Sequence, residues 1–432
     1  MIKLPEDVIY IINEIEKNGF EAFAVGGCIR DSLLGKTPND WDITTSAKPK
    51  DIIHMFDNTI ETGIEHGTVT VIIDKKQYEI TTYRIDGEYT DGRHPDNVEF
   101  TNCIKDDLSR RDFTINAMAY NNTNGLVDEF EGILDLKRRI IKCVGNPQKR
   151  FQEDALRMMR AIRFSAQLDF LIEKETFNAI EDMSDTIDAV SMERINVEFT
   201  KTLMSDSRKI SLYEESGILR KIIPEIYSNR EIDYLKLIRL GIECSNLCQK
   251  KLYTRLAAFF VYINEYINVE NIKKILKRMK YDNKSIEKTC KLLEFSKKNI
   301  TDNKEEIKYI LMKIGDIELV KSLVDLKRAE VKSYLIEDKK TNKDNVTDIL
   351  EVFTEESLEV LDRVEKILKE VVDKKECFSL KELEISGKDL IKMGIKPGKD
   401  IGKILDKILM EVIKNPDINK KEILIEMVKN IK

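Results

Sequence analysis

The spacing of hydrophobic and polar residues changes near residue 145. Before this point, short segments such as 68–73 and 77–83 alternate between apolar and polar positions, which is the period of a β-strand with one buried face. A helical stretch opens the chain ahead of them. After Asn146-Pro147, apolar residues recur every three or four positions, as they do across 358–372. The chain is therefore predicted to fold as an α+β head followed by an all-α remainder.

The length of the chain indicates that it contains several domains. A chain of 432 residues is longer than the about 250 to 300 residues at which a single hydrophobic core stops growing. We expect a head over 1–145, a neck over 146–210, a helical body over 211–300 and a helical tail over 301–432.

Composition narrows the class of protein. With 42% hydrophobic and 35% charged residues, the chain is typical of a globular protein. It has no apolar run of about 18 residues, which excludes a membrane-spanning helix, and its start has neither a basic leader nor an apolar signal core. The seven cysteines are scattered and odd in number, which fits a reducing compartment. We therefore expect a cytoplasmic protein without membrane contact.

Two carboxylates near the N-terminus suggest a metal site. Asp40 and Asp42 flank Trp41, and in a strand the residues i and i+2 point to the same face. Carboxylate oxygens are the ligands that Mg²⁺ prefers, together with water and substrate phosphate. The stretch therefore predicts a divalent-metal site with Trp41 turned into the core, although an Asp-x-Asp pair alone also occurs in solvated loops.

A glycine pair precedes these carboxylates. Gly26 and Gly27 end an apolar run, and without side chains their backbone N–H groups can lie close to a triphosphate. Arg30 adds a positive charge about one helical turn later. The pair predicts a phosphate cradle; its alternative is an ordinary turn.

A second basic block spans residues 110–119. Arg110 and Arg111 run directly into an apolar segment that also contains Asn116. Guanidinium groups suit bidentate contacts with phosphate, so Arg111 is predicted to bind the nucleotide at a pocket wall. The alternative is a salt bridge between Arg111 and a neighbouring acid.

A third polar pattern follows Arg150. Four charged residues recur at every third position, which on a helix forms a slowly drifting polar stripe; they are Asp154, Arg157, Arg160 and Arg163. Three apolar residues lie on another face and are predicted to pack inward; they are Leu156, Met159 and Ile162. The alternative is a solvated helix face.

The blocks GGCIRDSLLG, DWDIT, RRDFTINAMA, DEFEGILDL and RFQEDALRMMRAIRF occur in this order between about residues 20 and 205. Together they resemble the template-independent tRNA nucleotidyltransferases, specifically the bacterial class II CCA-adding enzymes, which are relatives of bacterial poly(A) polymerase in the DNA polymerase β superfamily. The resemblance implies a polymerase β-like nucleotidyltransferase head, and a protein that extends tRNA with CTP and ATP.

The resemblance also assigns catalytic roles. It implies that Asp40 and Asp42 hold two Mg²⁺ ions for attack of a tRNA 3′-hydroxyl on the α-phosphate. The superfamily usually has a third carboxylate, for which Glu79 in the alternating run 77–83 is the candidate. Its alternative is an outward-facing strand residue.

In the resembling enzymes, the Asp and the first Arg of the EDxxR pattern act as a protein template for the base. Asp154 can accept from the exocyclic amine of cytosine or adenine, while Arg157 donates to the adjoining ring acceptor. Uracil and guanine place a carbonyl where that amine should be, so they are rejected. Arg160 and Arg163 are expected to contact phosphate or brace this pair. The neck is thus expected to recognise the nucleobase.

Two family patterns favour addition of the complete CCA sequence. The loop 86–96 resembles the loop that CCA-adding enzymes use when they change from CTP to ATP, and EDALR is closer to these enzymes than to poly(A) polymerases. The alternatives are a poly(A) polymerase, an enzyme that adds only CC or only A, and a non-catalytic tRNA-binding protein.

The net charge of −6 is unusual for an RNA-binding protein, so the location of basic residues matters. In the tail, Lys399, Lys403 and Lys407 share one helix face behind the turn 394–398, which opens that helix. We expect this tail to bind the elbow of tRNA, with solvated lysines as the alternative. The sequence does not distinguish a monomer from a homodimer.

Overall fold

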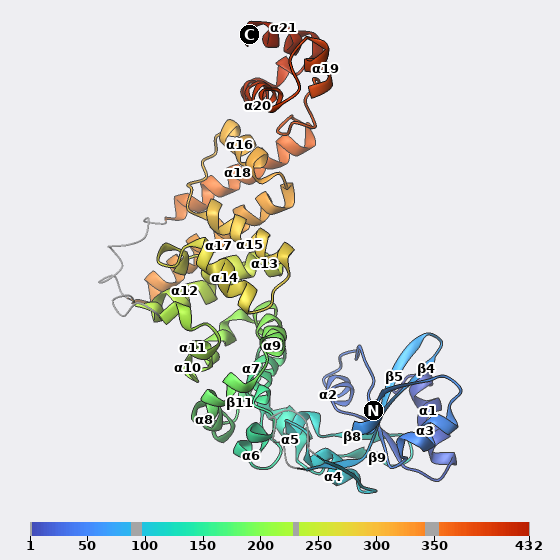
Figure 1. The fold of residues 1–432 in the computed structure, drawn as a ribbon. Helices are drawn as coiled ribbons and strands as arrows, with labels where there is room; N and C mark the ends of the chain where they lie inside the picture. Colours follow the sequence, from blue (N-terminus) through green and yellow to red (C-terminus); the bar gives the residue numbers. More distant parts are fainter. Residues whose placement is uncertain (1, 88–96, 228–232, 342–353, 432) are drawn as a thin grey trace. The chain divides into compact units, whose positions relative to one another are not determined.

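The computed structural model describes residues 2–87, 97–227, 233–341 and 354–431. The chain forms two compact units, residues 1–225 and 226–432 (Figure 1). Among the described residues, the strands all lie in the first unit, and the second unit contains helices and no strand. The predicted order of an α+β head followed by helices is confirmed. The division into four domains stays a prediction.

A seven-stranded mixed sheet forms the centre of the first unit. Its strand order is β3-β4-β5-β2-β1-β8-β9, and β2 and β5 are its parallel neighbours. The alternating segments predicted as strands are β4 and β5. The strands are β1 (Ala22–Val25), β2 (Ile43–Thr45), β3 (Thr59–Gly63), β4 (Thr68–Ile73), β5 (Lys76–Thr82), β8 (Ala119–Asn121) and β9 (Gly125–Val127).

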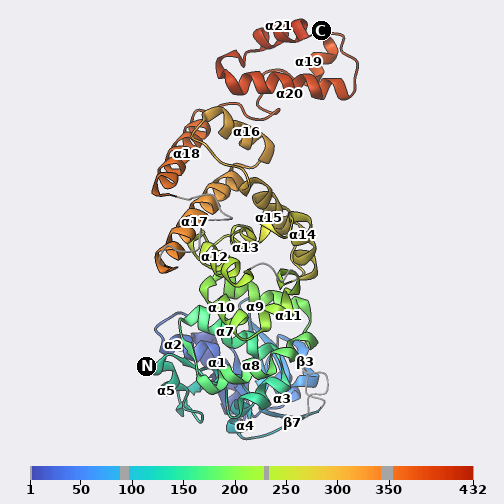
Figure 2. The ribbon, with the colours of Figure 1, turned by 90° about the vertical axis from the view of Figure 1, so that its left-hand side faces the viewer.

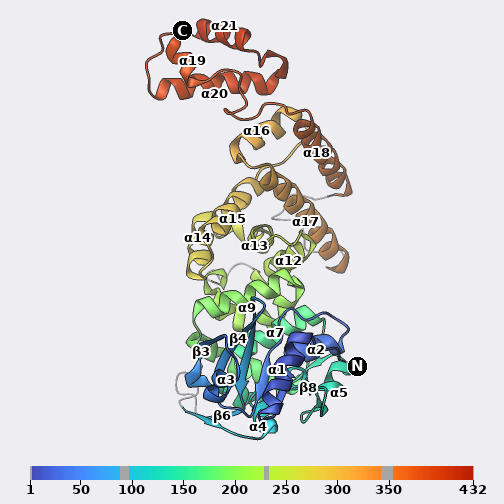
Figure 3. The same ribbon diagram turned by 90° about the vertical axis from the view of Figure 1, so that its right-hand side faces the viewer.

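Two helices, α1 (Glu6–Lys17) and α3 (Pro49–Met55), cover one face of the sheet (Figure 3). The buried residues of α1 recur every three or four positions and therefore form one stripe; they are Val8, Ile11, Ile12 and Ile15. They share a core with Ala22 and Ala24 of β1, and Trp41 packs against it as predicted.

The opposite face of the sheet has its own core. Phe23 and Val25 alternate with the alanines of β1 and pack with Leu108 of α4 (Ile104–Ser109). Because β1 is buried on both faces, it holds the turn that follows it in a defined place.

Short elements and helices complete the first unit, and α7 packs against α9. The helices are α2 (Gly27–Leu33), α5 (Gly132–Arg138), α6 (Pro147–Glu153), α7 (Leu156–Leu168), α8 (Lys174–Met183), α9 (Met192–Met204), α10 (Ser211–Glu215) and α11 (Ile218–Ile222). The remaining strands pair as β6 (Arg84–Asp86) with β7 (Val98–Phe100) and β10 (Ile140–Ile141) with β11 (Leu171–Ile172).

The described part of the second unit contains ten α-helices, α12 to α21, with short 3-10 helices between some of them (Figure 2). The helix predicted over 358–372 is α18, and four of its regularly spaced apolar residues are buried; they are Leu361, Val364, Leu368 and Val371. None of the described helices has the length and the apolar composition needed to cross a bilayer. The helices are α12 (Tyr234–Leu247), α13 (Leu252–Phe260), α14 (Val269–Arg278), α15 (Asn283–Ser296), α16 (Lys304–Ile314), α17 (Ile317–Thr341), α18 (Glu355–Asp373), α19 (Gly387–Lys392), α20 (Lys399–Lys414) and α21 (Lys421–Ile431).

A glycine allows the close approach of α12 and α13. A Cβ atom at Gly241 would lie 2.3 Å from the carbonyl oxygen of Phe259, which is a backbone clash. We expect Gly241→Ala to lower the free energy of unfolding by about 1–3 kcal/mol, because the two helices must separate. Gly402→Ala in α20 is the matched control: its Cβ meets open space, so the better helix former should add up to about 1 kcal/mol. Thermal unfolding measures both, and equal effects would contradict the clash.

Candidate active site

The carboxylates Asp40 and Asp42 lie just before β2. The prediction that they lie on a strand is wrong, since β2 begins at Ile43. The reason is that β1, its antiparallel partner, ends at Val25. One bond continues past the strand, from the Val25 N–H to the Asp42 carbonyl oxygen at 2.9 Å. This bond holds Asp42 at the edge of the sheet where β1 ends.

Glu79 of β5 reaches the same edge. Ile43 of β2 lies opposite Ile80 of β5 in parallel register, so the residues before them, Asp42 and Glu79, come side by side. Both are exposed; Glu79 lies between two buried residues, and Asp42 lies between half-buried Trp41 and buried Ile43. The strand register, which the sequence did not reveal, therefore places the third carboxylate next to the second.

The electrostatics of Asp42 show how close these charges are. Although much of its side chain is exposed, loss of water around the carboxylate raises the pKa of Asp42. The positive charge of Arg111 lowers this pKa, and the negative charges of Glu79 and Asp40 raise it. Two carboxylates and one guanidinium thus act on the charge of Asp42 at this edge of the sheet.

This donor set fits a hard cation. Mg²⁺ needs only one or two protein carboxylates, with water and substrate phosphate as its other ligands. A cation between Asp40 and Asp42 would relieve the repulsion that raises the pKa of Asp42. Among the described residues, no group of three or more Asp, Glu, His or Cys side chains is arranged to hold a metal ion.

The predicted phosphate cradle is a tight turn. Gly26 has φ of +83°, which favours glycine, and its N–H donates to the Met118 carbonyl oxygen at 3.0 Å. The helix α2 begins at Gly27. A Cβ at Gly26 would lie 3.0 Å from Nη1 of Arg111, so the turn and this guanidinium are in close contact.

We expect Gly26→Ala to weaken nucleotide binding, because the added methyl group displaces Arg111 as well as straining the backbone by about 1–2 kcal/mol. Gly35→Ala is the matched control, since Gly35 also has a positive φ, +71°, while its Cβ would meet nothing within 4 Å. Steady-state kinetics should show an increase in KM for the nucleotide with Gly26→Ala only. Equal KM values for the two variants would contradict this role of the turn.

Arg110 and Arg111 are held by a buried carboxylate, Asp107 of α4. Its Oδ1 accepts from Arg110 at 2.7 and 3.0 Å, and its Oδ2 accepts from Arg111 at 3.4 Å and from the Thr44 hydroxyl at 3.1 Å. Burial alone would raise the pKa of Asp107, but the two guanidinium groups outweigh it and the pKa is lowered. The salt bridge considered as an alternative for Arg111 is present, and Arg111 nevertheless acts on Asp42.

A buried network joins α2 to the neck. Arg30 donates to Oδ1 of Asn116 at 2.6 Å, and the Asn116 amide donates to Asp112 at 3.1 Å. Arg160 of α7 then donates twice to Oδ2 of Asp112, at 2.8 and 2.6 Å. Burial opposes ionisation of Asp112, but these partners lower its pKa to about 2. The head and the neck are therefore joined by charged groups at the site.

The ring of Phe164 lies beneath three guanidinium groups. The distances from Cζ to the ring centroid are 5.1 Å for Arg30, 5.4 Å for Arg160 and 3.9 Å for Arg163. Arg163 also binds Glu198 of α9 at 2.5 Å and is buried. Arg163 is thus placed to brace α7.

The segment after Arg150 was predicted to be one helix, but it forms two helices. Asp154 therefore lies between the helices and not on one. The helix α6 ends at Glu153, Asp154 is extended with φ of −152°, and α7 begins at Leu156. Its carboxylate accepts from Arg194 of α9 at 2.7 Å. Leu156, Met159 and Ile162 are buried as predicted.

Arg157 lies in the first turn of α7 and faces the head. It donates to Glu153 at 2.6 Å and to the carbonyl oxygen of Arg110 at 3.0 Å. Arg150 binds the same Glu153 at 2.5 Å and the carbonyl oxygen of Ser109 at 2.9 Å. Two neck arginines thus cap the C-terminal end of α4.

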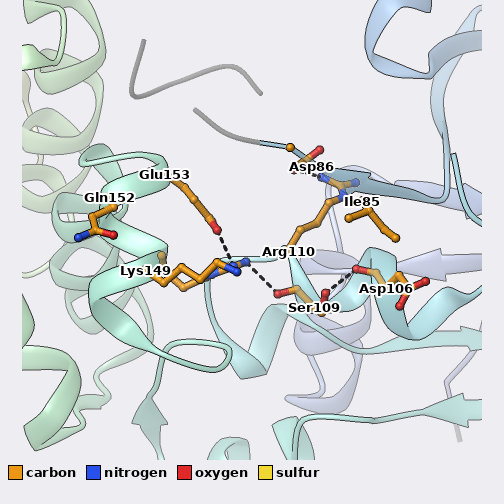
Figure 4. Close-up of a pocket in the computed structure, with 10 residues that line it drawn as sticks. Ile85, Asp86, Asp106, Ser109, Arg110, Lys149, Gln152 and Glu153 are labelled. Atoms are coloured by element: carbon orange, nitrogen blue, oxygen red, sulfur yellow. Dashed lines mark hydrogen bonds and ion pairs between the residues drawn. The ribbon is translucent and has the colours of Figure 1, made fainter. Parts of the chain in front are cut away.

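A cavity of about 550 Å³ lies where the head meets α6 (Figure 4). Its wall combines Arg110 and Asp86 of the head with Lys149 and Glu153 of α6. Glu153 and the carbonyl oxygen of Ser109, both labelled in Figure 4, accept hydrogen bonds from the Arg150 guanidinium. Asp86 and Gly87, the first residues of the loop 86–96, also line the cavity, and residues 88–96 of that loop lie outside the described residues.

The sequence patterns did not identify the residues that form ion pairs with the predicted site residues. They are Asp107, Asp112, Glu153, Arg194 and Glu198. The first two flank the arginine pair, so spacing alone was a usable signal. Arg194 and Glu198 meet the site only through packing of α9 on α7, for which the sequence holds no local signal.

Comparison with known proteins identifies the class. Residues 22–142 match the family described as "Poly A polymerase head domain", residues 169–229 match "Probable RNA and SrmB-binding site of polymerase A", and residues 253–428 match "tRNA nucleotidyltransferase domain 2 putative". With its carboxylates and glycine turn at one edge of a mixed sheet, the chain is a nucleotidyltransferase.

Full-length relatives define the family. A CCA-adding enzyme of Ligilactobacillus salivarius is 36% identical, with 98% of this chain and 95% of the relative covered. One of Enterococcus faecalis is 35% identical, with 97% and 94% covered. The crystal structure of the Bacillus stearothermophilus CCA-adding enzyme in complex with CTP has a TM-score of 0.74 at 27% identity, covering 99% and 98%. The chain belongs to the CCA-adding enzymes.

Proposed function

We propose that the protein adds CCA to the 3′ end of tRNA, with CTP and ATP as substrates. Family membership and the likeness to a CTP complex support this proposal. The observation that carries it is the edge of the sheet, where the strand register sets Asp42 beside Glu79 and the turn at Gly26 lies against Arg111. A tRNA substrate implies a cytoplasmic location.

The residues of this edge have complementary roles in the proposed transfer. Asp40 and Asp42 would hold Mg²⁺, with Glu79 beside them, and bound Mg²⁺ neutralises charge on the attacking and leaving oxygens. The N–H groups at Gly26 and Gly27, together with Arg111, would hold the triphosphate. In the reaction, the 3′-hydroxyl oxygen bonds to the α-phosphorus, the hydroxyl proton is lost and pyrophosphate leaves.

The neck is proposed to select the base. Asp154 accepts from the amine of cytosine or adenine, and Arg157 donates to the ring acceptor beside it. In the structure, partners hold both side chains: Arg194 holds Asp154, and Glu153 holds Arg157. Arg160 and Arg163 brace the helix through Asp112 and Glu198, while Arg30 and Asn116 connect this network to the phosphate turn.

The tail is proposed to contact the tRNA elbow. Lys399, Lys403 and Lys407 are exposed on α20, while Ile408 and Val412 of the same helix are buried in the core that it shares with α19 and α21. One face thus packs and the other presents positive charge to phosphate.

The test is extension of three tRNAs, ending before CCA, after C and after CC, with CTP, ATP or both, in the presence and absence of Mg²⁺. We expect products that stop at CCA and require Mg²⁺. A long A tail would instead identify a poly(A) polymerase, and products ending early would identify a CC- or A-only enzyme. Absence of extension with retained tRNA binding would identify a binding protein.

A further inference from the structure

The carboxylate of Asp154 is held from two directions. Its Oδ1 accepts from the Leu156 N–H at 3.1 Å, which belongs to the first turn of α7. Its Oδ2 accepts from Nη2 of Arg194 at 2.7 Å. The side chain of Asp154 is 15% exposed and that of Arg194 is 23% exposed. The plane of the carboxylate is therefore determined by one backbone donor and one guanidinium.

Arg194 belongs to a helix that also supports the neighbouring helix α7. It lies four residues before Glu198 on α9, so both side chains leave the same face of that helix. Glu198 binds Arg163 of α7 at 2.5 Å. Arg194 therefore extends from a helix that is packed against α7, and this gives its guanidinium group a rigid support.

We propose that Arg194 is a positioning residue that sets nucleobase selectivity by fixing the Asp154 carboxylate. This inference rests on the proposed function, in which Asp154 accepts from the amine of the incoming base. Each carboxylate oxygen has a lone pair left for that amine after binding Leu156 or Arg194. Arg194 therefore fixes the orientation of the Asp154 carboxylate and leaves a lone pair free to accept from the amine of the base.

Rigidity is what makes this acceptor selective. A fixed carboxylate meets the carbonyl oxygen of uracil or guanine without a proton between them, which is unfavourable. A carboxylate held only at Oδ1 can turn away from that carbonyl oxygen. Loss of Arg194 therefore reduces the penalty for wrong bases more than it reduces the rate with correct ones.

We expect Arg194→Gln to lower the ratio of kcat/KM for CTP over UTP, and for ATP over GTP, by about tenfold, the effect of loosening one charge-assisted hydrogen bond. Arg194→Lys keeps the charge with a single donor head and should lose about threefold. Single-nucleotide incorporation into tRNA ending before C and after CC measures these ratios. A ratio from one preparation is independent of the fraction of folded enzyme.

Arg208→Gln is the matched control. Arg208 pairs with Asp206 at 2.9 Å in the same unit, and its side chain is 60% exposed, so its loss should leave both ratios unchanged. Asp154→Asn is the reference variant. It separates the proposed role of Asp154 in base selection from the proposed role of Arg194 in positioning Asp154. If wild-type protein extends no tRNA, or if Asp154→Asn keeps full selectivity, the proposed function or the template fails. If Asp154→Asn loses selectivity while Arg194→Gln and Arg194→Lys keep it, the inference about Arg194 is wrong.

Discussion

The double variant Asp40→Ala/Asp42→Ala is expected to lose nucleotide incorporation by at least about a thousandfold. The pair is the proposed holder of Mg²⁺, and loss of several kcal/mol of charge stabilisation reduces the rate about tenfold for each 1.36 kcal/mol. The tRNA affinity should change little, because phosphate contacts are expected from the arginines and from the tail. Incorporation under single-turnover conditions and tRNA binding by filter retention measure the two quantities.

Stability provides an independent readout of the same variant. The pKa of Asp42 is raised, so the folded state binds its proton more tightly than the unfolded state, and the ionised form costs stability above that pKa. Removing the carboxylates should therefore not lower the melting temperature. Mg²⁺ should raise the melting temperature of the wild type and not that of the variant.

The matched control for this variant is Asp57→Ala, which removes an exposed carboxylate from the same unit. It should retain both incorporation and the stabilisation by Mg²⁺. Persistent incorporation in the double variant would show that the metal is held elsewhere. Loss of incorporation with an unchanged response to Mg²⁺ would separate the catalytic role of the pair from metal binding.

Asp154→Asn is expected to lower the preference for CTP over UTP by about a hundredfold, the effect of replacing a charged acceptor that a buried donor requires. The amide can turn its NH₂ group toward the carbonyl oxygen of uracil or guanine, so incorporation of UTP and GTP should rise while that of CTP and ATP falls. The kcat/KM values for the four nucleotides measure this change.

Asp169→Asn is the matched control for Asp154→Asn. Asp169 follows α7 and pairs with Arg139, and both side chains are largely exposed, where an ion pair contributes little. The Asp169→Asn variant should show the same preference for CTP over UTP as the wild type. An unchanged preference in Asp154→Asn would rule out this residue as part of a protein template.

Local sequence patterns predicted the elements well. Alternation in 68–73 identified β4, helical spacing in 358–372 identified most of α18, and Gly398 precedes α20 as expected. Each pattern records which positions face a core, and that is a property of neighbouring residues. The same patterns failed where a partner strand ends, as at Asp42, or where a helix is interrupted by one extended residue, as at Asp154.

The order and chemistry of the motifs, read along the chain, were sufficient to predict a nucleotidyltransferase with a helical remainder; the residues proposed for its site stay a prediction. What holds those residues depended on tertiary structure. The parallel register of β2 and β5 brings Glu79 beside Asp42, and packing of α9 on α7 brings Arg194 to Asp154. Residues 37 and 40 positions apart meet only when strands pair and helices pack, and no short-range periodicity records such a contact.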